Sequence, residues 1–340
     1  MKTAIRIVGI SFAIFWVLSL IVTESGHAEQ VVTTKYSEWQ DTKRNRSIPV
    51  KFYIPKDDAH SSKPYPVVIF SHGLGGSREA AVYLGDYLCR NGYLGVFIQH
   101  PGSDESFWRP EVEKQAGKID RAQLMQKFKI TVANPVHAVN RAQDVHFVID
   151  MLETVNKSDP LLHGKIDLKK MAIAGHSYGS WTALTASGQC IVTQTGREIS
   201  SPDKRLKAAI YLSPTPPKKG VDPAMVYGKI QIPGLHFTGT QDNSPVNNTK
   251  AEDRRIAFDN ISKSDQYLVI LDGADHMVFG GRARGKVIPI DVKHQEIVKL
   301  TSLRFLDAYL KGDEQAKVWL NAQAPSYIKP YGIYELKAAK

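Results

Sequence analysis

The chain of 340 residues is 42% hydrophobic and 23% charged, and it contains no compositionally biased tract. This length and composition are sufficient for one large α/β domain or two small ones. The formal net charge of +10 is interpreted as a spread of solvated lysines, because no cluster of Lys and Arg with interleaved aromatics is present. Nucleic acid is therefore excluded as an expected partner.

The first residues differ from the rest of the chain. Lys2 and Arg6 precede an apolar run over residues 7–22, and the small residues Gly26 and Ala28 precede a polar stretch. This pattern predicts a secretory signal peptide over residues 1–28, cleaved after Ala28; the alternative is an uncleaved anchor helix. We expect an exported protein, periplasmic or secreted, with no stable membrane span after cleavage.

Residues 36–55 are expected to form two antiparallel strands around a polar turn. Six further runs are short and apolar, and each has Gly, Ser, Asp or His at or near its end: 65–73, 93–103, 170–177, 206–214, 232–242 and 266–276. Helical stretches separate them, which predicts a mostly parallel central sheet with helices on both faces. In such a sheet, ligands bind at the carboxyl ends of the strands.

Four stretches are expected to be helical: 77–92, 138–157, 179–189 and 289–312, the last of which closes the domain. The segment 103–135 is polar and has no strand partner. It is interpreted either as a lid or insertion over the site or as a surface excursion. No internal repeat and no linker-like run is present, so residues 29–340 are predicted to form a single domain.

The sequence AIAGHSYGSWTAL, residues 172–184, places Ser177 in a G-x-S-x-G motif between a predicted strand and a predicted helix. A nucleophile on such a turn takes unusual backbone angles, and the residues two before and two after it crowd the backbone. Gly175 and Gly179 occupy those two positions, and neither has a side chain that could clash there. This context favours a nucleophilic Ser177 over an idle serine in a glycine-rich turn.

A serine hydroxyl is a weak nucleophile that needs a base, which is itself oriented by an acid. After a G-x-S-x-G turn, the acid and then the base follow along the chain. Only His276 and His294 come after residue 242. His276 follows the final predicted strand, whereas His294 is interpreted as a surface residue of the last helix. His276 is therefore the predicted base.

Asp242 is the predicted acid, because it ends the preceding strand and is followed by a turn. The alternative for Asp242 is a purely turn-forming role before Asn-Ser-Pro. The other carboxylates in this part of the chain either lie in a predicted helix or flank the base too closely to face its ring: Asp253, Asp259, Asp272 and Asp275.

The oxyanion of an acyl-transfer reaction needs preorganised donors. The backbone N–H of Tyr178, directly after the nucleophile, is one candidate, and that of Leu74 in the glycine-rich loop 71–76 is the other. His72 is interpreted as shaping this loop. The loop lacks the Lys-Ser/Thr that a phosphate-binding loop requires. Trp108, Trp181 and Met277 are candidates for the substrate pocket, although such side chains are as often core residues.

These residues resemble the serine α/β-hydrolase superfamily, specifically its dienelactone-hydrolase-like, platelet-activating-factor-acetylhydrolase-like and bacterial polyesterase-like branches. The matching stretches are RNRSIPVKFYIP, VVIFSHGLGGSRE, GYLGVFIQHPGSD, GHSYGS, GTQDNSPV and GADHMVF, which lie within residues 36–312. The resemblance implies the α/β-hydrolase fold. It also implies Ser177 as nucleophile, His276 as base, Asp242 as acid, and Leu74 and Tyr178 as oxyanion donors.

Three features depart from these branches. Dienelactone hydrolases use a cysteine nucleophile, whereas this chain has serine. The acetylhydrolase branch places its acid after the preceding strand, where this chain reads YLSPTPP without a carboxylate, and Ser180 replaces a usual glycine. The resemblance further implies that Cys89 and Cys190 lie on opposite faces of the sheet, too far apart for a disulfide. Two free thiols are expected.

Together these features predict ester hydrolysis through an acyl-enzyme, without a metal ion or an organic cofactor. The expected partner is a small-molecule or lipid-like ester, and no oligomeric state is predicted. Two alternatives remain open: an amidase, peptidase or lactonase with the same triad, and a non-catalytic binding protein with this fold.

Overall fold

The computed structural model describes residues 32–56, 64–114, 120–192, 198–244, 246–281 and 289–340. The predicted signal peptide lies outside these residues. Within them, no helix combines the length and the apolar character that crossing a bilayer requires.

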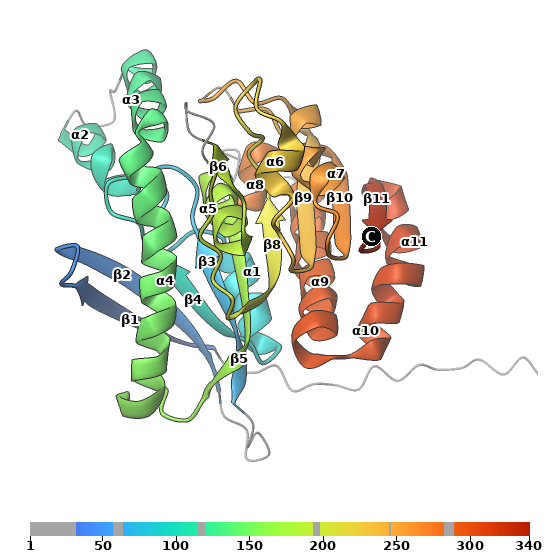
Figure 1. Cartoon of the computed structure of the whole chain (residues 1–340), viewed down its shortest axis with the longest axis horizontal. Coiled ribbons are helices and arrows are strands. Elements are labelled where there is room, and N and C mark those ends of the chain that lie inside the picture. The colour runs from blue at the N-terminus through green and yellow to red at the C-terminus, as the bar shows by residue number, and fades with distance from the viewer. Residues whose placement is uncertain (1–31, 57–63, 115–119, 193–197, 245, 282–288) are drawn as a thin grey trace, which may run out of the picture.

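Nine strands form one sheet in the order β1-β2-β4-β3-β5-β8-β9-β10-β11 (Figure 1). Neighbouring strands from β4 to β10 are parallel, whereas β1, β2 and β11 are antiparallel to their neighbours. The predicted mostly parallel sheet with an N-terminal hairpin is confirmed. The strands are β1 Val32–Asp41, β2 Arg46–Pro55, β3 Tyr65–Ser71, β4 Leu94–Ile98, β5 Ile166–His176, β8 Leu206–Leu212, β9 Gly234–Gln241, β10 Gln266–Asp275 and β11 Gly332–Lys337.

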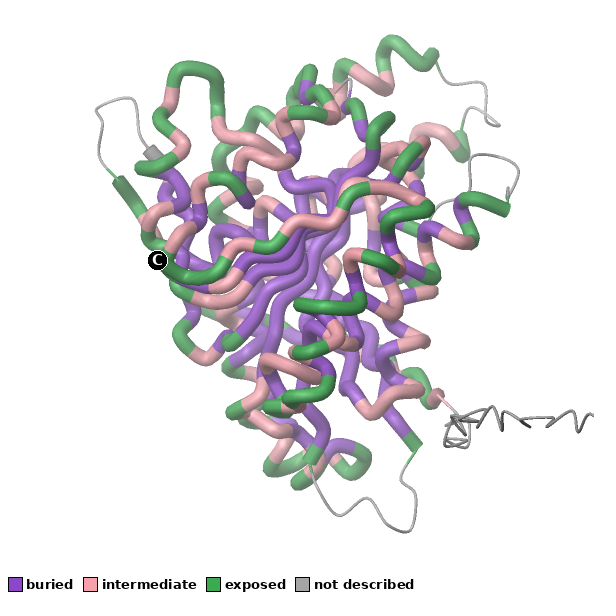
Figure 2. Tube along the Cα trace, turned by 90° about the vertical axis from the view of Figure 1, so that its right-hand side faces the viewer, coloured by how far each residue is buried: buried purple, intermediate pink, exposed green. Residues whose placement is uncertain are grey.

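Helices cover both faces of the sheet, because successive strand residues point to opposite sides. In β3, Val67 and Ile69 belong to one apolar cluster and Val68 and Phe70 to the other. Helices α4 (Pro135–Ser158) and α5 (Tyr178–Ser187) cover the first face, and α1 (Val82–Arg90) and α9 (Pro289–Leu306) cover the second. Figure 2 shows the strands as a buried layer through the middle of the molecule.

Apart from α3 (Arg121–Ala133), the remaining elements are short. They are helices α2 (Arg109–Lys114), α6 (Pro223–Tyr227), α7 (Ile256–Asn260), α8 (His276–Phe279), α10 (Glu314–Val318) and α11 (Ala324–Ile328), the helical turns η1 (Glu105–Phe107), η2 (Ala251–Arg255), η3 (Asp307–Lys311), η4 (Trp319–Gln323) and η5 (Lys329–Tyr331), and the hairpin β6 (Ile191–Val192) and β7 (Glu198–Ile199). The predicted helix at 77–92 is shorter than expected, since α1 begins only at Val82.

Two expectations about the C-terminal part of the chain are wrong. The helix at 289–312 does not close the fold, because the chain continues through α10 and α11 into β11, which pairs with β10. His294 is not a surface residue: it is fully buried. Helix α9 contacts α1, α8 and α10 as well as β9 and β10, so it is covered by more than the sheet alone.

Cys89 and Cys190 are both buried and both free, as expected. Cys89 lies in α1, and Cys190 follows α5. Because α1 and α5 pack on opposite faces of the sheet, the sheet separates the two thiols.

The fully buried His236 in β9 predicts a loss of stability in acid. Burial lowers the pKa of His236 to about 4, and the hydrogen bond between Nε2 and Oε1 of Gln266 (2.9 Å) opposes that shift only in part. The folded state therefore holds a neutral ring, whereas the unfolded chain binds a proton below about pH 6.5. This stability is fully present above about pH 6.5 and is lost as the pH falls toward 4.

In urea titrations, wild-type protein is expected to lose about 2–3 kcal/mol more unfolding free energy between pH 7 and pH 4.5 than His236→Gln. His163→Gln is the matched control, because His163 is exposed, and it is expected to follow the wild type. Equal acid losses in wild type and His236→Gln would contradict this assignment.

Candidate active site

Ser177 lies at the turn between β5 and α5 in a strained conformation, with φ 57° and ψ −116°. The two motif glycines make this turn possible. A Cβ on Gly175 would overlap the carbonyl oxygen of Gly179, and a Cβ on Gly179 would overlap that of Ser71. The close approach of three backbone segments therefore requires glycine at both positions, and it lifts the Ser177 side chain beyond the sheet edge.

Three side chains distant in sequence meet at the carboxyl ends of β5, β9 and β10. Oγ of Ser177 lies 2.9 Å from Nε2 of His276, and Nδ1 of His276 lies 2.7 Å from Oδ1 of Asp242. Asp242 is fully buried, whereas the His276 side chain is 18% exposed. With Nδ1–H donating to the carboxylate, Nε2 is free to accept the serine proton.

Asp242 is held by two further residues. Thr238 Oγ1 donates to Oδ2 at 2.9 Å, and the buried guanidinium of Arg254 lies 3.0 Å from Oδ1 through Nε. Arg254 also donates to the backbone oxygens of Asp242, Ser213 and Pro214. Arg254 thus ties the end of β9, which carries the carboxylate, to the end of β8, where the acetylhydrolase branch was expected to place its acid.

The other carboxylates that were candidates for the acid occupy other places in the fold. Asp253 is in η2 and Asp259 in α7, where Asp259 pairs with Arg255. Asp275 caps α8 by accepting from the N–H groups of Met277 and Val278, and Asp272 is exposed. Among these carboxylates, none has a hydrogen bond to the ring of His276 in the described part of the chain.

The two predicted oxyanion donors border the same space. Leu74 and Tyr178 line a cavity together with Ser177, and in the described residues neither backbone N–H has an acceptor. A Cβ on Gly73 would lie 3.5 Å from Cβ of Ser177, so the loop passes directly beside the nucleophile. His72 holds this loop through Nδ1 to the Gly73 oxygen (2.6 Å) and Nε2 to the N–H of residue 100 (3.0 Å).

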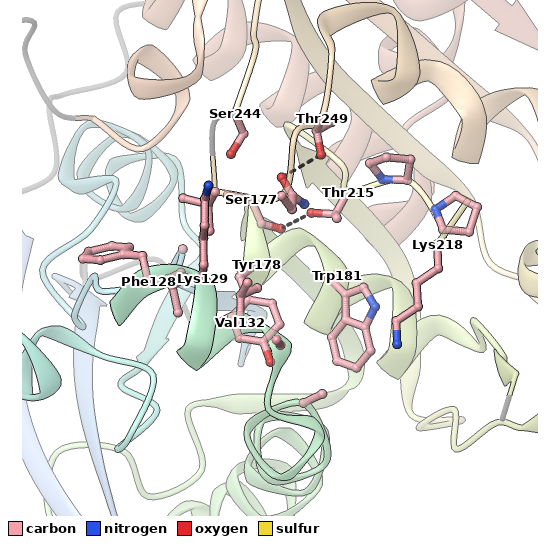
Figure 3. A pocket seen from close by; sticks show the side chains of 18 of the residues that line it. Phe128, Lys129, Val132, Ser177, Tyr178, Trp181, Thr215, Lys218, Ser244 and Thr249 are labelled. Atoms are coloured by element: carbon pink, nitrogen blue, oxygen red, sulfur yellow. Dashed lines mark hydrogen bonds between the residues drawn. The ribbon is translucent and has the colours of Figure 1, made fainter. Parts of the chain in front are cut away.

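The cavity beside Ser177 has a volume of about 1090 Å³ (Figure 3). One wall is α3, within the segment 103–135, which contributes Leu124, Met125, Phe128 and Val132. Of the residues predicted for the pocket, Trp181 and Met277 line it. Trp108 is not among the lining residues; its Nε1 donates to the Gly75 oxygen at 2.8 Å, and its ring lies against Phe128.

The charged side chains that line the cavity are basic. Arg121 and Lys129 come from α3, and Lys218 and Lys219 from the loop after β8, and all four are exposed. Lys129 and Lys218 lie on opposite sides of the view in Figure 3. No Asp or Glu is found among the described lining residues. An apolar chamber with a cationic rim favours ligands that combine an apolar part with a negative charge.

Two buried arginines were not identified from the sequence. Arg254 lies in AEDRR, a charged stretch that is typical of an exposed segment, and no nearby residue pattern predicts its burial. Arg141 carried a signal, because it lies four and seven residues before Val145 and Val148 on the predicted apolar side of its helix. Within the described residues, no group of three or more His, Cys, Asp or Glu side chains is arranged to hold a metal ion.

The sequence of this chain matches the model of a known protein family. The family model of platelet-activating factor acetylhydrolase, isoform II, matches residues 49–279, which is more than half of the chain. The chain belongs to this family. Of the three branches that the sequence resembles, the acetylhydrolase branch is the one matched.

Two relatives of the acetylhydrolase family show how far the similarity extends. Platelet-activating factor acetylhydrolase of the guinea pig (Cavia porcellus) is 23% identical over 302 residues, covering 80% of this chain and 63% of that protein. The enzyme of the same name from the dog (Canis lupus familiaris) is 26% identical over 145 residues, covering 37% of this chain and 32% of that protein. The match thus spans less than two thirds of either relative.

Proposed function

We propose that this chain is an exported serine carboxylic-ester hydrolase that acts through Ser177, His276 and Asp242. The observation that supports the proposal best is the continuous pair of hydrogen bonds from the Ser177 hydroxyl through the imidazole to a buried carboxylate. Family membership supports the same reaction class.

In the first half of the reaction, Oγ of Ser177 attacks the ester carbonyl carbon while its proton passes to Nε2 of His276. In this mechanism the tetrahedral oxyanion accepts hydrogen bonds from the N–H groups of Leu74 and Tyr178. The bond to the leaving oxygen then breaks, and His276 returns the proton to the departing alcohol. The acyl group remains on Ser177.

In the second half, a water molecule takes the place of the alcohol. His276 removes a proton from it, the resulting hydroxide attacks the acyl carbon, and a second tetrahedral intermediate collapses to the free acid and Ser177. Asp242 stabilises the imidazolium in both halves and fixes Nδ1 as the protonated nitrogen. No step requires a metal ion or an organic cofactor.

The substrate we propose is a small lipid-like ester. The relatives are named for removing an acetyl group from platelet-activating factor. In this chain, the apolar side chains of α3 can bury an acyl or alkyl chain, and the basic rim favours an anionic group on the same molecule. We therefore propose that α3 forms one wall of the substrate chamber.

The function is tested by incubating the purified mature protein with p-nitrophenyl esters of increasing acyl length, matched p-nitroanilides and lactones. Esters are expected to be hydrolysed at least about 100-fold faster than the anilides, because p-nitrophenolate leaves as a stable anion whereas the p-nitroaniline nitrogen has to be protonated before it can leave. Faster hydrolysis of anilides or lactones would replace the ester assignment with an amidase or lactonase. Absence of all hydrolysis would favour a non-catalytic binding protein.

A further inference from the structure

Arg141, on α4, is fully buried behind the loop 71–76 and the first turn of α5. Its guanidinium donates to four oxygens: Oγ1 of Thr182 (2.9 Å), Oγ of Ser103 (2.9 Å), Oγ of Ser71 (3.1 Å) and the backbone oxygen of His72. All four acceptors are neutral. No carboxylate forms an ion pair with Arg141 in the described part of the chain.

Three of these acceptors belong to the two segments that carry the oxyanion donors, and the fourth, Ser103, contacts one of those segments. Ser71 and His72 begin the loop that presents the N–H of Leu74. Ser103 holds the same loop from outside, because its backbone oxygen accepts from the N–H of residue 75 at 2.9 Å. Arg141 therefore fixes this loop from two directions.

The second segment is the first turn of α5. Oγ1 of Thr182 accepts from Nε of Arg141 and donates to the backbone oxygen of Tyr178 at 3.0 Å. The guanidinium carbon also lies 4.6 Å from the centre of the Tyr178 ring, which is a cation–π arrangement. One side chain thus contacts both segments that supply an oxyanion donor.

A chain of hydrogen bonds through Asp144, His100 and Ser71 determines which atom donates and which accepts at Arg141. Burial and the nearby Arg141 charge lower the pKa of His100 to about 4, so its ring is neutral. Burial would raise the pKa of Asp144, but hydrogen bonds from His100 and Arg46 hold it at about 2. Nδ1–H of His100 therefore donates to Asp144 (2.9 Å), its Nε2 accepts from Ser71 (2.9 Å), and the Ser71 oxygen accepts from Arg141.

Burying a guanidinium that has no carboxylate partner lowers the free energy of unfolding. Burial lowers the pKa of Arg141 to about 10, so the group stays cationic at neutral pH. In a low-dielectric interior this charge acts over several ångströms on any negative charge that develops beside Leu74 and Tyr178. Preorganised positive charge of this kind stabilises an oxyanion more than a neutral ground state.

We propose that Arg141 is a positioning residue of the oxyanion hole, which holds the N–H groups of Leu74 and Tyr178 in place and supplies positive charge behind them. The inference rests on the proposed function, since it requires an oxyanion at this site. Arg141 acts through the two donors and does not itself touch the substrate.

The test compares Arg141→Gln and Arg141→Lys with wild type in kcat, KM and inhibition by an alkyl boronic acid, which becomes tetrahedral and anionic on Ser177. Arg141→Gln is expected to lower kcat about 100-fold or more, within the range for loss of one oxyanion donor, with KM changed less than about threefold. Boronate affinity should fall in parallel with kcat, whereas affinity for the neutral ketone of the same chain should not. Arg141→Lys is expected to restore part of kcat.

Arg205→Gln is the matched control, because Arg205 also binds α4, through Asp150 and Glu153, but in the described residues it has no hydrogen bond to the loop 71–76 or to the first turn of α5. It should lower the Tm and leave kcat within about twofold. If Arg141→Gln does not fold, Thr182→Val and Ser103→Ala each remove one acceptor and are expected to lower kcat about 5–10-fold, again without a matching change in KM.

Folded Arg141→Gln with kcat within threefold of wild type would overturn the inference, as would equal losses of boronate and ketone affinity. If Arg141→Gln does not fold, kcat within twofold of wild type in both acceptor variants would do so too. Failure of the proposed function is a different result, because wild-type protein would then neither hydrolyse esters nor bind the boronate.

Discussion

Replacing Ser177 with alanine is expected to lower kcat for ester hydrolysis about 10⁶-fold, to the level of trace contamination. The reason is that the residue supplies the only oxygen within hydrogen-bond reach of Nε2 of His276 in the described residues. The fold should be retained, because alanine meets the same positive φ as serine and loses no structural hydrogen bond of the side chain other than that to His276. Unchanged Tm with abolished turnover is the expected pair of measurements.

Ser180→Ala is the matched control for this change. Ser180 lies three residues later in α5, is fully buried, and its Oγ has no hydrogen-bond partner in the described part of the chain. Its removal is expected to leave kcat within about twofold and the Tm equal or higher, because an unsatisfied hydroxyl is lost. Turnover by Ser177→Ala above about 1% of wild type would contradict the nucleophile assignment.

Asp242→Asn is expected to lower kcat about 10⁴-fold. The asparagine amide would donate to Nδ1 of His276, which moves the ring proton to Nε2 and blocks acceptance of the Ser177 proton. The change also leaves the guanidinium of Arg254, which is 1% exposed, without its carboxylate. Removing one partner of such a buried pair costs about 3–5 kcal/mol of unfolding free energy.

Kinetics and urea unfolding of Asp242→Asn therefore have to be measured on the same preparation. Asp272→Asn serves as control, because Asp272 is an exposed carboxylate four residues before His276, and it should change neither quantity appreciably. Full activity of a folded Asp242→Asn variant would assign the acid to another residue, and comparable losses in Asp272→Asn would show that the effect is not specific to the buried carboxylate.

The sequence was most informative about the parallel strands and the residues that end them. β3, β5, β8, β9 and β10 are apolar on both faces, so their runs stand out, and parallel topology brings their carboxyl ends to one edge. Ser177, Asp242 and His276 could therefore be predicted together, because the motif fixes one member and chain order restricts the other two. The structure places the His276 ring within hydrogen-bond distance of both Ser177 and Asp242.

What could not be predicted depends on contacts between distant segments. Arg254 reads as one more charge in a polar stretch, and only the ends of β8 and β9 give it a buried role. The burial of His294 depends on how α9 packs among segments that are distant in sequence, since α9 contacts α1 and β9 as well as its neighbours along the chain. β11 pairs only at the sheet edge and is partly exposed, so its apolar pattern is weak.

The most direct test of the account is covalent labelling of the mature protein with a fluorophosphonate probe, followed by mass spectrometry of the peptides. We predict one probe per chain, attached to Ser177, and slow or absent labelling of His276→Gln and Asp242→Asn. Probe attached to a different serine, or folded wild-type protein that catalyses hydrolysis without being labelled, would contradict this prediction.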